Sequence, residues 1–194
     1  ITPKSFITIF GASFGGKSTE LENLKADIMD VNINPEAKDY VWVSNSFEMT
    51  NFATTMRDVK KLTKLSFGEI LKKPFTEEEK LILGEYKSKK IDGRFFVNQV
   101  PLSAEEFLKE TEQFLLQHKD KKLVVLDLDH VALLRAKNDN KKLAIDDMVE
   151  GLNALKNKFD NFLVVLLTQA NRSVLGRLKE KSNESRLRRD DIYM

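Results

Sequence analysis

The sequence predicts an α/β fold, in which helices cover both faces of a largely parallel central sheet. Short apolar segments that fit the strands of this sheet occur at residues 6–10, 40–43, 95–97, 123–128 and 162–167. Most of them are continuously apolar rather than alternating, which is typical of strands covered on both faces. Periodic segments of helical length separate them. This alternation favours a parallel sheet between two layers of helices.

Apolar spacing and capping residues predict the helices. Intervals of three and four residues mark two amphipathic segments, at Met49, Phe52, Met56 and Val59 and at Ile145, Met148, Leu152, Leu155 and Phe159. Two further helices are expected to begin with capping boxes, at Thr76 with Glu79 and at Ser103 with Glu106. There is no internal repeat, low-complexity tract or long linker, so we expect a single domain over residues 1–194.

The composition excludes several classes of protein. A hydrophobic fraction of 41% beside 32% charged residues is that of an ordinary globular chain. The absence of cysteine excludes a disulfide framework and a thiolate metal site. No apolar run is as long as a membrane span, and the first residues do not resemble a signal peptide. We therefore expect a cytoplasmic protein without a membrane partner.

Basic residues gather near the end of the chain, at Arg172, Arg177, Lys179, Lys181, Arg186, Arg188 and Arg189. The formal net charge of the whole chain is only +2, so this local excess says more about partners than the total does. Such a segment can contact phosphate groups, and it can equally be a solvated surface.

Residues 11–18, GASFGGKS, match the phosphate-binding pattern G-x-x-x-x-G-K-[ST]. An expected strand precedes them and an amphipathic helix follows, as this P-loop requires. Its glycines let successive N–H groups point at phosphates, and the helix N-terminus adds partial positive charge. Lys17 is expected to reach the β- and γ-phosphates, and the Ser18 hydroxyl to bind Mg²⁺. The sequence thus predicts an ATP site formed by Gly11, Ala12, Ser13, Phe14, Gly15, Gly16, Lys17, Ser18 and Thr19.

A P-loop enzyme also needs a carboxylate for Mg²⁺ at the end of a neighbouring strand, and residues 123–134 offer two. Asp129 ends the apolar run, where a side chain can face a ligand in the crevice at the carboxyl ends of the strands. Asp127 lies inside the run, where it is expected to be buried or to point elsewhere. We favour Asp129 and keep Asp127 as the alternative. His130, a lone histidine, is expected to pack or to form hydrogen bonds rather than to catalyse.

Four stretches together resemble a known family. They are the P-loop segment at residues 1–18, SFEM at 46–49, LDHVALL at 128–134 and LTQANRS at 167–173. In this order and spacing they resemble the ATPase domain of DnaB-like hexameric helicases and their phage relatives, within the RecA and KaiC group. The resemblance covers nearly the whole chain and implies a RecA-like fold. It also implies that the strand ending at Gln169 lies between the P-loop strand and the strand that ends at Asp129.

The resemblance assigns roles to residues that the pattern alone leaves open. Glu48 would activate the attacking water, Gln169 would sense the γ-phosphate, and Lys17 would complete the catalytic set. The implied function is ATP hydrolysis coupled to translocation on single-stranded DNA, and hence duplex unwinding, in a bacterial or phage-encoded protein. DNA contacts are expected from Arg172, Arg177, Arg186 and Arg188.

The resemblance also implies partners, namely single-stranded DNA, other subunits of a hexamer and a primase bound through an amino-terminal domain. The chain departs from the family pattern near its end, where Tyr193 stands at an expected arginine. We expect the arginine-finger strands and the amino-terminal domain to lie outside this sequence, which would make the chain truncated at both ends.

Two alternatives remain open at this stage. A RecA- or KaiC-like ATPase in recombination or signalling would use the same nucleotide machinery. A small P-loop kinase is the other, although kinases usually carry an arginine-rich lid. LDHVALL and the QANR stretch that begins at Gln169 favour the RecA group.

Overall fold

The computed structural model describes residues 2–11, 16–46, 51–91, 93–98, 102–129 and 141–169. Its elements are, in chain order, β1 (Phe6–Gly11), α1 (Lys17–Met29), the 3₁₀ turn η1 (Pro35–Asp39), β2 (Tyr40–Ser46), α2 (Asn51–Thr63), α3 (Phe67–Lys72), α4 (Glu77–Ile91), β3 (Phe95–Asn98), α5 (Ala104–Gln117), β4 (Leu123–Asp129), α6 (Lys141–Lys158) and β5 (Phe162–Gln169). All five expected strands are present, each within a few residues of its predicted bounds.

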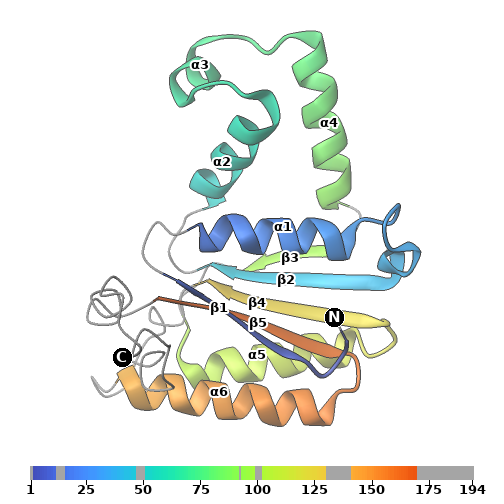
Figure 1. Cartoon of the computed structure of the whole chain (residues 1–194), viewed down its shortest axis with the longest axis vertical. Helices are drawn as coiled ribbons and strands as arrows, with labels where there is room; N and C mark the ends of the chain where they lie inside the picture. The colour runs from blue at the N-terminus through green and yellow to red at the C-terminus, as the bar shows by residue number, and fades with distance from the viewer. Residues whose placement is uncertain are drawn as a thin grey trace, which may run out of the picture.

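The strands form one parallel sheet in the order β1-β5-β4-β2-β3. Helix α1 covers one face, and α5 and α6 cover the other, so the domain has three layers (Figure 1). Because every strand runs the same way, all their carboxyl ends meet at one edge of the sheet. The position of β5 between β1 and β4 confirms the strand order that the family resemblance implied.

The core consists of two apolar clusters, one on each face of the sheet. In β4, Val124, Leu126 and Leu128 pack against α5 and α6, whereas Leu123 and Val125 pack beneath α1. This alternation within a continuously apolar strand is what burial on both faces requires. The apolar stripe predicted for α6 is confirmed, since its members from position 148 to 159 all lie in the cluster between α6 and the sheet.

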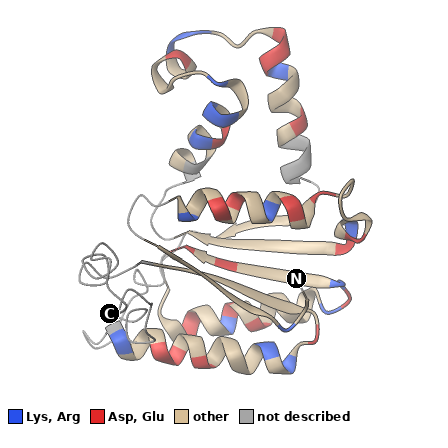
Figure 2. Ribbon diagram, viewed as in Figure 1, with Lys and Arg blue, Asp and Glu red and all other residues tan. Residues whose placement is uncertain are grey.

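The edge strand β3 differs from this pattern. The side chains of Phe96 and Val97 are 36% and 46% exposed, because within the described residues β3 pairs with β2 alone. Figure 2 shows that charged residues lie mainly on the helices and loops. In the five strands the only charged residues are Asp127 and Asp129, both in β4. None of the described helices is long and apolar enough to cross a bilayer.

Helices α2, α3 and α4 project from the α1 side of the domain, away from the sheet (Figure 1). The stripe predicted for α2 does not turn Phe52 towards the core. Phe52 is 61% exposed, and its ring lies perpendicular to that of Phe67, with 6.5 Å between the ring centroids. Met49, the first residue of that stripe, lies outside the described residues. A hydrogen bond from the Tyr86 hydroxyl to Asp58 ties α4 to α2, and burial together with this partner raises the pKa of Tyr86.

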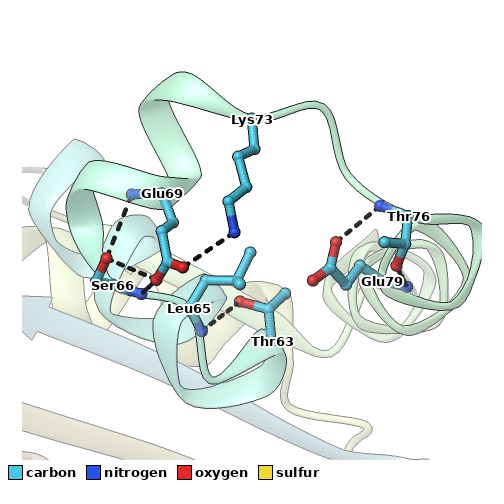
Figure 3. A network of polar contacts seen from close by, with 7 residues as sticks. All are labelled: Thr63, Leu65, Ser66, Glu69, Lys73, Thr76 and Glu79. Carbon is cyan, nitrogen blue, oxygen red and sulfur yellow. Dashed lines mark hydrogen bonds and ion pairs between the residues drawn. The ribbon is translucent and has the colours of Figure 1, made fainter.

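Capping boxes fix the starts of α3, α4 and α5, as Figure 3 shows for the first two. The Thr76 N–H donates to Glu79 Oε2 at 2.7 Å and the Glu79 N–H donates back to Thr76 Oγ1 at 3.2 Å, as predicted. The box predicted at the start of α5 is also present. A third, Ser66 with Glu69, begins α3, and Lys73 pairs with the same carboxylate at 3.0 Å. These bonds satisfy the backbone donors that open each helix.

Candidate nucleotide-binding site

The predicted phosphate loop joins the carboxyl end of β1 to the start of α1. Gly11 is the last residue of β1, and Gly16 precedes α1 with φ 79°, a left-handed conformation that favours glycine. Gly16 has no side chain that could cap the helix, so the first-turn N–H groups of α1 can face an anion. Residues 12–15 lie outside the described residues, and Thr19 is exposed in the first turn of α1.

Lys17 is the first residue of α1 and is only 8% exposed. Its Nζ donates to the carbonyl oxygen of Gly11 at 3.1 Å, so the side chain lies back over the end of β1. A Cβ atom at Gly11 would stand 3.3 Å from Lys17 Cγ, which is tighter than most such contacts. Glycine at position 11 thus gives the lysine side chain room to lie over the end of β1.

Ser18 and Asp129 meet at the carboxyl edge of the sheet. The Ser18 hydroxyl donates to Asp129 Oδ2 at 3.1 Å, and Asp129 is 6% exposed at the last position of β4. A hydroxyl and a carboxylate side by side suit Mg²⁺, which binds through one or two protein oxygens while phosphates and water supply the others. The residues present therefore fit the cation that a P-loop nucleotide brings with it.

Asp127, the alternative carboxylate, lies two residues earlier on the same face of β4 and is 1% exposed. Its Oδ2 accepts hydrogen bonds from Trp42 Nε1 at 2.5 Å and from Ser44 Oγ at 2.6 Å. Burial raises the pKa of Asp127, while the charge of Lys25 and these two hydrogen bonds act in the opposite direction. Its Oδ1 is buried and has no hydrogen-bond partner among the described residues.

A small polar cavity of about 40 Å³ connects these groups. Its walls include Ser18 and Lys25 of α1, Ser44 of β2, Arg57 of α2 and Asp129 of β4. None of the predicted motifs contains Lys25, Ser44 or Arg57. The available signal is positional: Lys25 follows Ser18 by seven residues, or about two turns of helix, and therefore lies on the same face of α1.

A larger cavity of about 180 Å³ lies on the opposite face, between α5 and the strands β2, β3 and β4. Its lining is mostly apolar and aromatic, with Phe96, Phe107 and Phe114 among its walls. It includes none of the predicted nucleotide-binding residues that the structure describes. Its size makes it conspicuous, but the residue types needed for phosphate chemistry are on the α1 face.

The other predicted site residues divide into two groups. Gln169 is the last residue of β5, and its Cα pairs in register with that of Gly11, which brings the ends of β5 and β1 side by side. Glu48 lies outside the described residues, as do the predicted DNA contacts Arg172, Arg177, Arg186 and Arg188. The structure therefore brings together Gly11, Lys17, Ser18, Asp129 and the main chain of Gln169.

Comparison with known proteins gives the family. The sequence model for the DnaB-like helicase C terminal domain matches residues 1–191. No curated protein matches the sequence significantly. Among solved structures, one ATPase domain has a TM-score of 0.72 at 19% identity, over 99% of this chain and 64% of that one. A DnaB-like replicative helicase, solved in a study of its interactions with primase, has a TM-score of 0.70 at 18% identity.

The second likeness covers 98% of this chain and 43% of the helicase chain, so this chain spans less than two thirds of either relative. At these identities the two solved structures show the fold alone. The sequence model covers nearly all of the chain and includes the P-loop segment, which implies a nucleotide-binding domain. On that match, with the three-layer fold and the paired Ser18 and Asp129 in agreement, the chain belongs to the DnaB-like helicase C-terminal domain family.

Proposed function

We propose that this domain is the ATP-hydrolysing motor of a replicative DNA helicase, which couples hydrolysis to translocation on single-stranded DNA and so to duplex unwinding. The observation that carries the proposal is the contact between Ser18 and Asp129, made at the mouth of a P-loop in a chain of this family. A hydroxyl and a carboxylate held together at that edge are the protein's share of a Mg-nucleotide site.

Each residue of this site has a role that follows from its chemistry. The glycine loop and the N-terminus of α1 bind the phosphates, and Lys17 stabilises the charge that develops on the transferred phosphoryl group. Ser18 and Asp129 would hold Mg²⁺, which neutralises phosphate charge when bound. The Lys17 ammonium group lies 3.1 Å from the Gly11 carbonyl oxygen at the end of β1, beside the proposed phosphate site.

Glu48 and Gln169 complete the proposed machinery. Glu48 follows β2 by two residues, and β2 ends at Ser46, whose Cα pairs with that of Asp129. A glutamate near this edge is suited to accept a proton from the attacking water, as a general base must. Gln169 is suited to report on the γ-phosphate, because β5 ends beside Gly11. Both roles rest on the family resemblance together with these strand positions.

In the assembled protein we propose a hexameric ring, in which a neighbouring subunit supplies an arginine to each site. Such an arginine is typically worth a factor of about 10³–10⁵ in turnover. The segment with Arg172, Arg177, Arg186 and Arg188 would contact the DNA backbone independently of sequence. An amino-terminal domain outside residues 1–194 would bind primase, and the machine would act in the cytoplasm of a bacterial cell.

Two measurements test this function. The first is Mg-ATP binding by the 194-residue chain, followed by calorimetry with and without Mg²⁺. The second is ATP turnover and displacement of a strand from a forked duplex by the ring-forming protein. We expect turnover to rise with single-stranded DNA and the rise to fade with added salt, because phosphate contacts release counterions. Brisk turnover by a dilute monomer, indifferent to DNA, would instead identify a self-contained P-loop enzyme.

A further inference from the structure

Asp127 is a carboxylate in the middle of a buried strand. The residues around it in β4, from Leu123 to Leu128, are otherwise apolar, and all are buried. A charged group at such a position costs stability unless it is paired, and an apolar residue would pack there without that cost. The strand therefore does not need Asp127 for its own formation, and the partners of Asp127 indicate what it does.

Three side chains of β2 donate hydrogen bonds to this one residue. Trp42 Nε1 and Ser44 Oγ donate to Asp127 Oδ2, at 2.5 Å and 2.6 Å. Asn45, itself 2% exposed, donates through Nδ2 to the main-chain oxygen of Asp127 at 3.0 Å. The carboxyl-terminal half of β2 is thus held to β4 by side-chain hydrogen bonds as well as by the backbone pairing of the sheet.

Helix α1 joins the same network through Lys25. Its Nζ donates to Ser44 Oγ at 3.1 Å, and Ser44 in turn donates to Asp127. The ammonium group also lies over the rings of Trp42 and Phe95, at 5.8 Å and 5.7 Å from their centroids. A cation held near a buried carboxylate offsets part of the cost of burying that charge. The network therefore joins the helix that carries Lys17 and Ser18 to two strands of the sheet.

The network lies two residues further from the carboxyl edge of the sheet than the proposed nucleotide site. In the register of β2 and β4, Ser44 pairs with Asp127 and Ser46 pairs with Asp129. Side chains two residues apart on a strand share a face, about 6.6 Å apart along the chain direction. A tie between Ser44 and Asp127 therefore fixes where Ser46, the last residue of β2, lies relative to Asp129.

We propose that Asp127 is a positioning residue of the nucleotide site, which holds β2 and α1 against β4 and so couples Trp42 to the binding of Mg-nucleotide at Ser18 and Asp129. Asp127 reaches no nucleotide in this role and acts through its neighbours. The inference rests on the proposed function, since it presupposes that Mg-nucleotide binds at Ser18 and Asp129.

Trp42 gives this proposal a direct readout, because it is the only tryptophan of the chain. Its emission is measured while a non-hydrolysable ATP analogue with Mg²⁺ is added, and calorimetry measures binding independently. We expect a saturable change in the wild-type chain. In Asp127→Leu and in Ser44→Ala the analogue should still bind with a Kd within about threefold of wild type. The emission change should be largely lost, and turnover of the assembled protein should fall about 10- to 100-fold, as for small misplacements near a reaction site.

Asn161→Ala is the matched control. Asn161 Nδ2 donates to the main-chain oxygens of His118 and Lys121, at 3.2 Å and 2.8 Å, close to the amino-terminal end of β5. Its loss removes two partly buried hydrogen bonds at the opposite end of the strands from the proposed nucleotide site, so the thermal midpoint should fall while the Trp42 response and turnover stay as in wild type. Asp127→Asn keeps one oxygen acceptor, and it should restore part of what Asp127→Leu loses.

The outcomes separate the two ideas. If the wild-type chain binds no Mg-nucleotide, the proposed function fails and this inference falls with it. If wild type binds and Asp127→Leu keeps the wild-type Trp42 response and turnover, the positioning role alone is wrong. If Asp127→Leu instead loses the Mg²⁺ dependence of binding, Asp127 is a cation ligand and the inference is again wrong. Should Asp127→Leu not fold, Ser44→Ala decides by the same criteria, because it removes a single hydroxyl.

Discussion

Ser18 and Asp129 are joined by a 3.1 Å hydrogen bond, although 111 positions of sequence separate them. The parallel sheet makes this possible, because α1 begins and β4 ends at the same edge. The bond holds a hydroxyl and a carboxylate side by side where we propose that Mg-nucleotide binds, so the proposed site is organised before nucleotide arrives. Preorganisation of this kind limits the rearrangement needed when phosphate charge must be stabilised.

The first prediction concerns the register of the acidic strand. Asp129→Asn should weaken the Mg²⁺ dependence of nucleotide binding, because it removes the carboxylate beside Ser18. Asp127→Asn should keep that dependence, since Asp127 is bonded to Trp42 and Ser44. Calorimetric titration of ATP across a range of Mg²⁺ concentrations measures both. The reverse pattern would mean that the cation ligand lies two residues earlier than we propose.

Lys17 and Gly11 give a second prediction. Lys17→Ala should abolish tight ATP binding, because the phosphates lose their cation. Gly11→Ala should weaken binding by less, since its new Cβ would stand 3.3 Å from Lys17 Cγ and displace the lysine by a few tenths of an ångström. ATP affinity is the measurement, and circular dichroism of the nucleotide-free protein is the control. Wild-type affinity and turnover in Lys17→Ala would contradict the P-loop interpretation.

A third prediction addresses the proposed general base. Glu48→Gln should leave Mg-ATP binding intact and reduce hydrolysis by the assembled protein about 10²–10⁴-fold, since an amide cannot take the proton of the water. Binding and single-turnover hydrolysis are measured on the same preparation. Glu85→Gln, on the projecting helix α4, is the matched control and should hydrolyse ATP like wild type. Equal loss of binding and turnover in Glu48→Gln would instead assign Glu48 a part in binding.

A fourth prediction concerns the stability effects of replacing two helical glycines. A Cβ at Gly151 of α6 would lie 2.3 Å from Leu108 Cδ1, whereas a Cβ at Gly84 of α4 would meet nothing within 4 Å. Gly151→Ala should therefore destabilise the domain by about 1 kcal/mol, because overpacking of about 1–3 kcal/mol exceeds the gain in helix propensity. Gly84→Ala should stabilise it by about 0.5–1 kcal/mol. Denaturant titration measures both, and adding Leu108→Ala should relieve the Gly151→Ala defect.

A fifth prediction concerns how the capping box of α3 responds to pH. Hydrogen bonds from the Ser66 N–H and hydroxyl, with Lys73 beside them, lower the pKa of Glu69 from 4.5 to about 2. A lowered carboxyl pKa means that the cap contributes fully above pH 4.5 and is lost as the pH falls towards 2. The carboxyl carbon shift of Glu69 should titrate with a midpoint near 2, and Lys73→Ala should raise it. An ordinary midpoint in wild type would show that the box is open in solution.

The strands and caps were predictable because their causes are local. Burial on two faces leaves a continuously apolar run, and a hydroxyl followed by glutamate caps a helix wherever it occurs. The exposure of Phe52 was not predictable, because it depends on α2 meeting α3 outside the sheet layers, through Phe67. Periodicity shows that a helix has an apolar side and does not show what covers it.

The site divides in the same way. The P-loop residues form a contiguous motif, and the burial expected for an aspartate inside the run at position 127 is confirmed. The donors to Asp127 were not predictable, because Trp42 and Ser44 reach it only through the pairing of β2 with β4. The roles of Glu48 and of the terminal arginines stay predictions, since these residues lie outside the described part of the chain.

The pairing of β1 has a consequence for how this protein folds. β1 is synthesised before the other four strands, yet within the described residues its sheet partner is β5. Phe6 can therefore pair with Val164 only after most of the domain has been made. Contacts between such distant segments are slow to form, because closing a long loop costs entropy before the pairing returns any stability. The strands β4, β2 and β3 can assemble from earlier parts of the nascent chain. The strand that leads into the P-loop should therefore dock late, and competence to bind nucleotide should be among the last properties that a newly made molecule acquires.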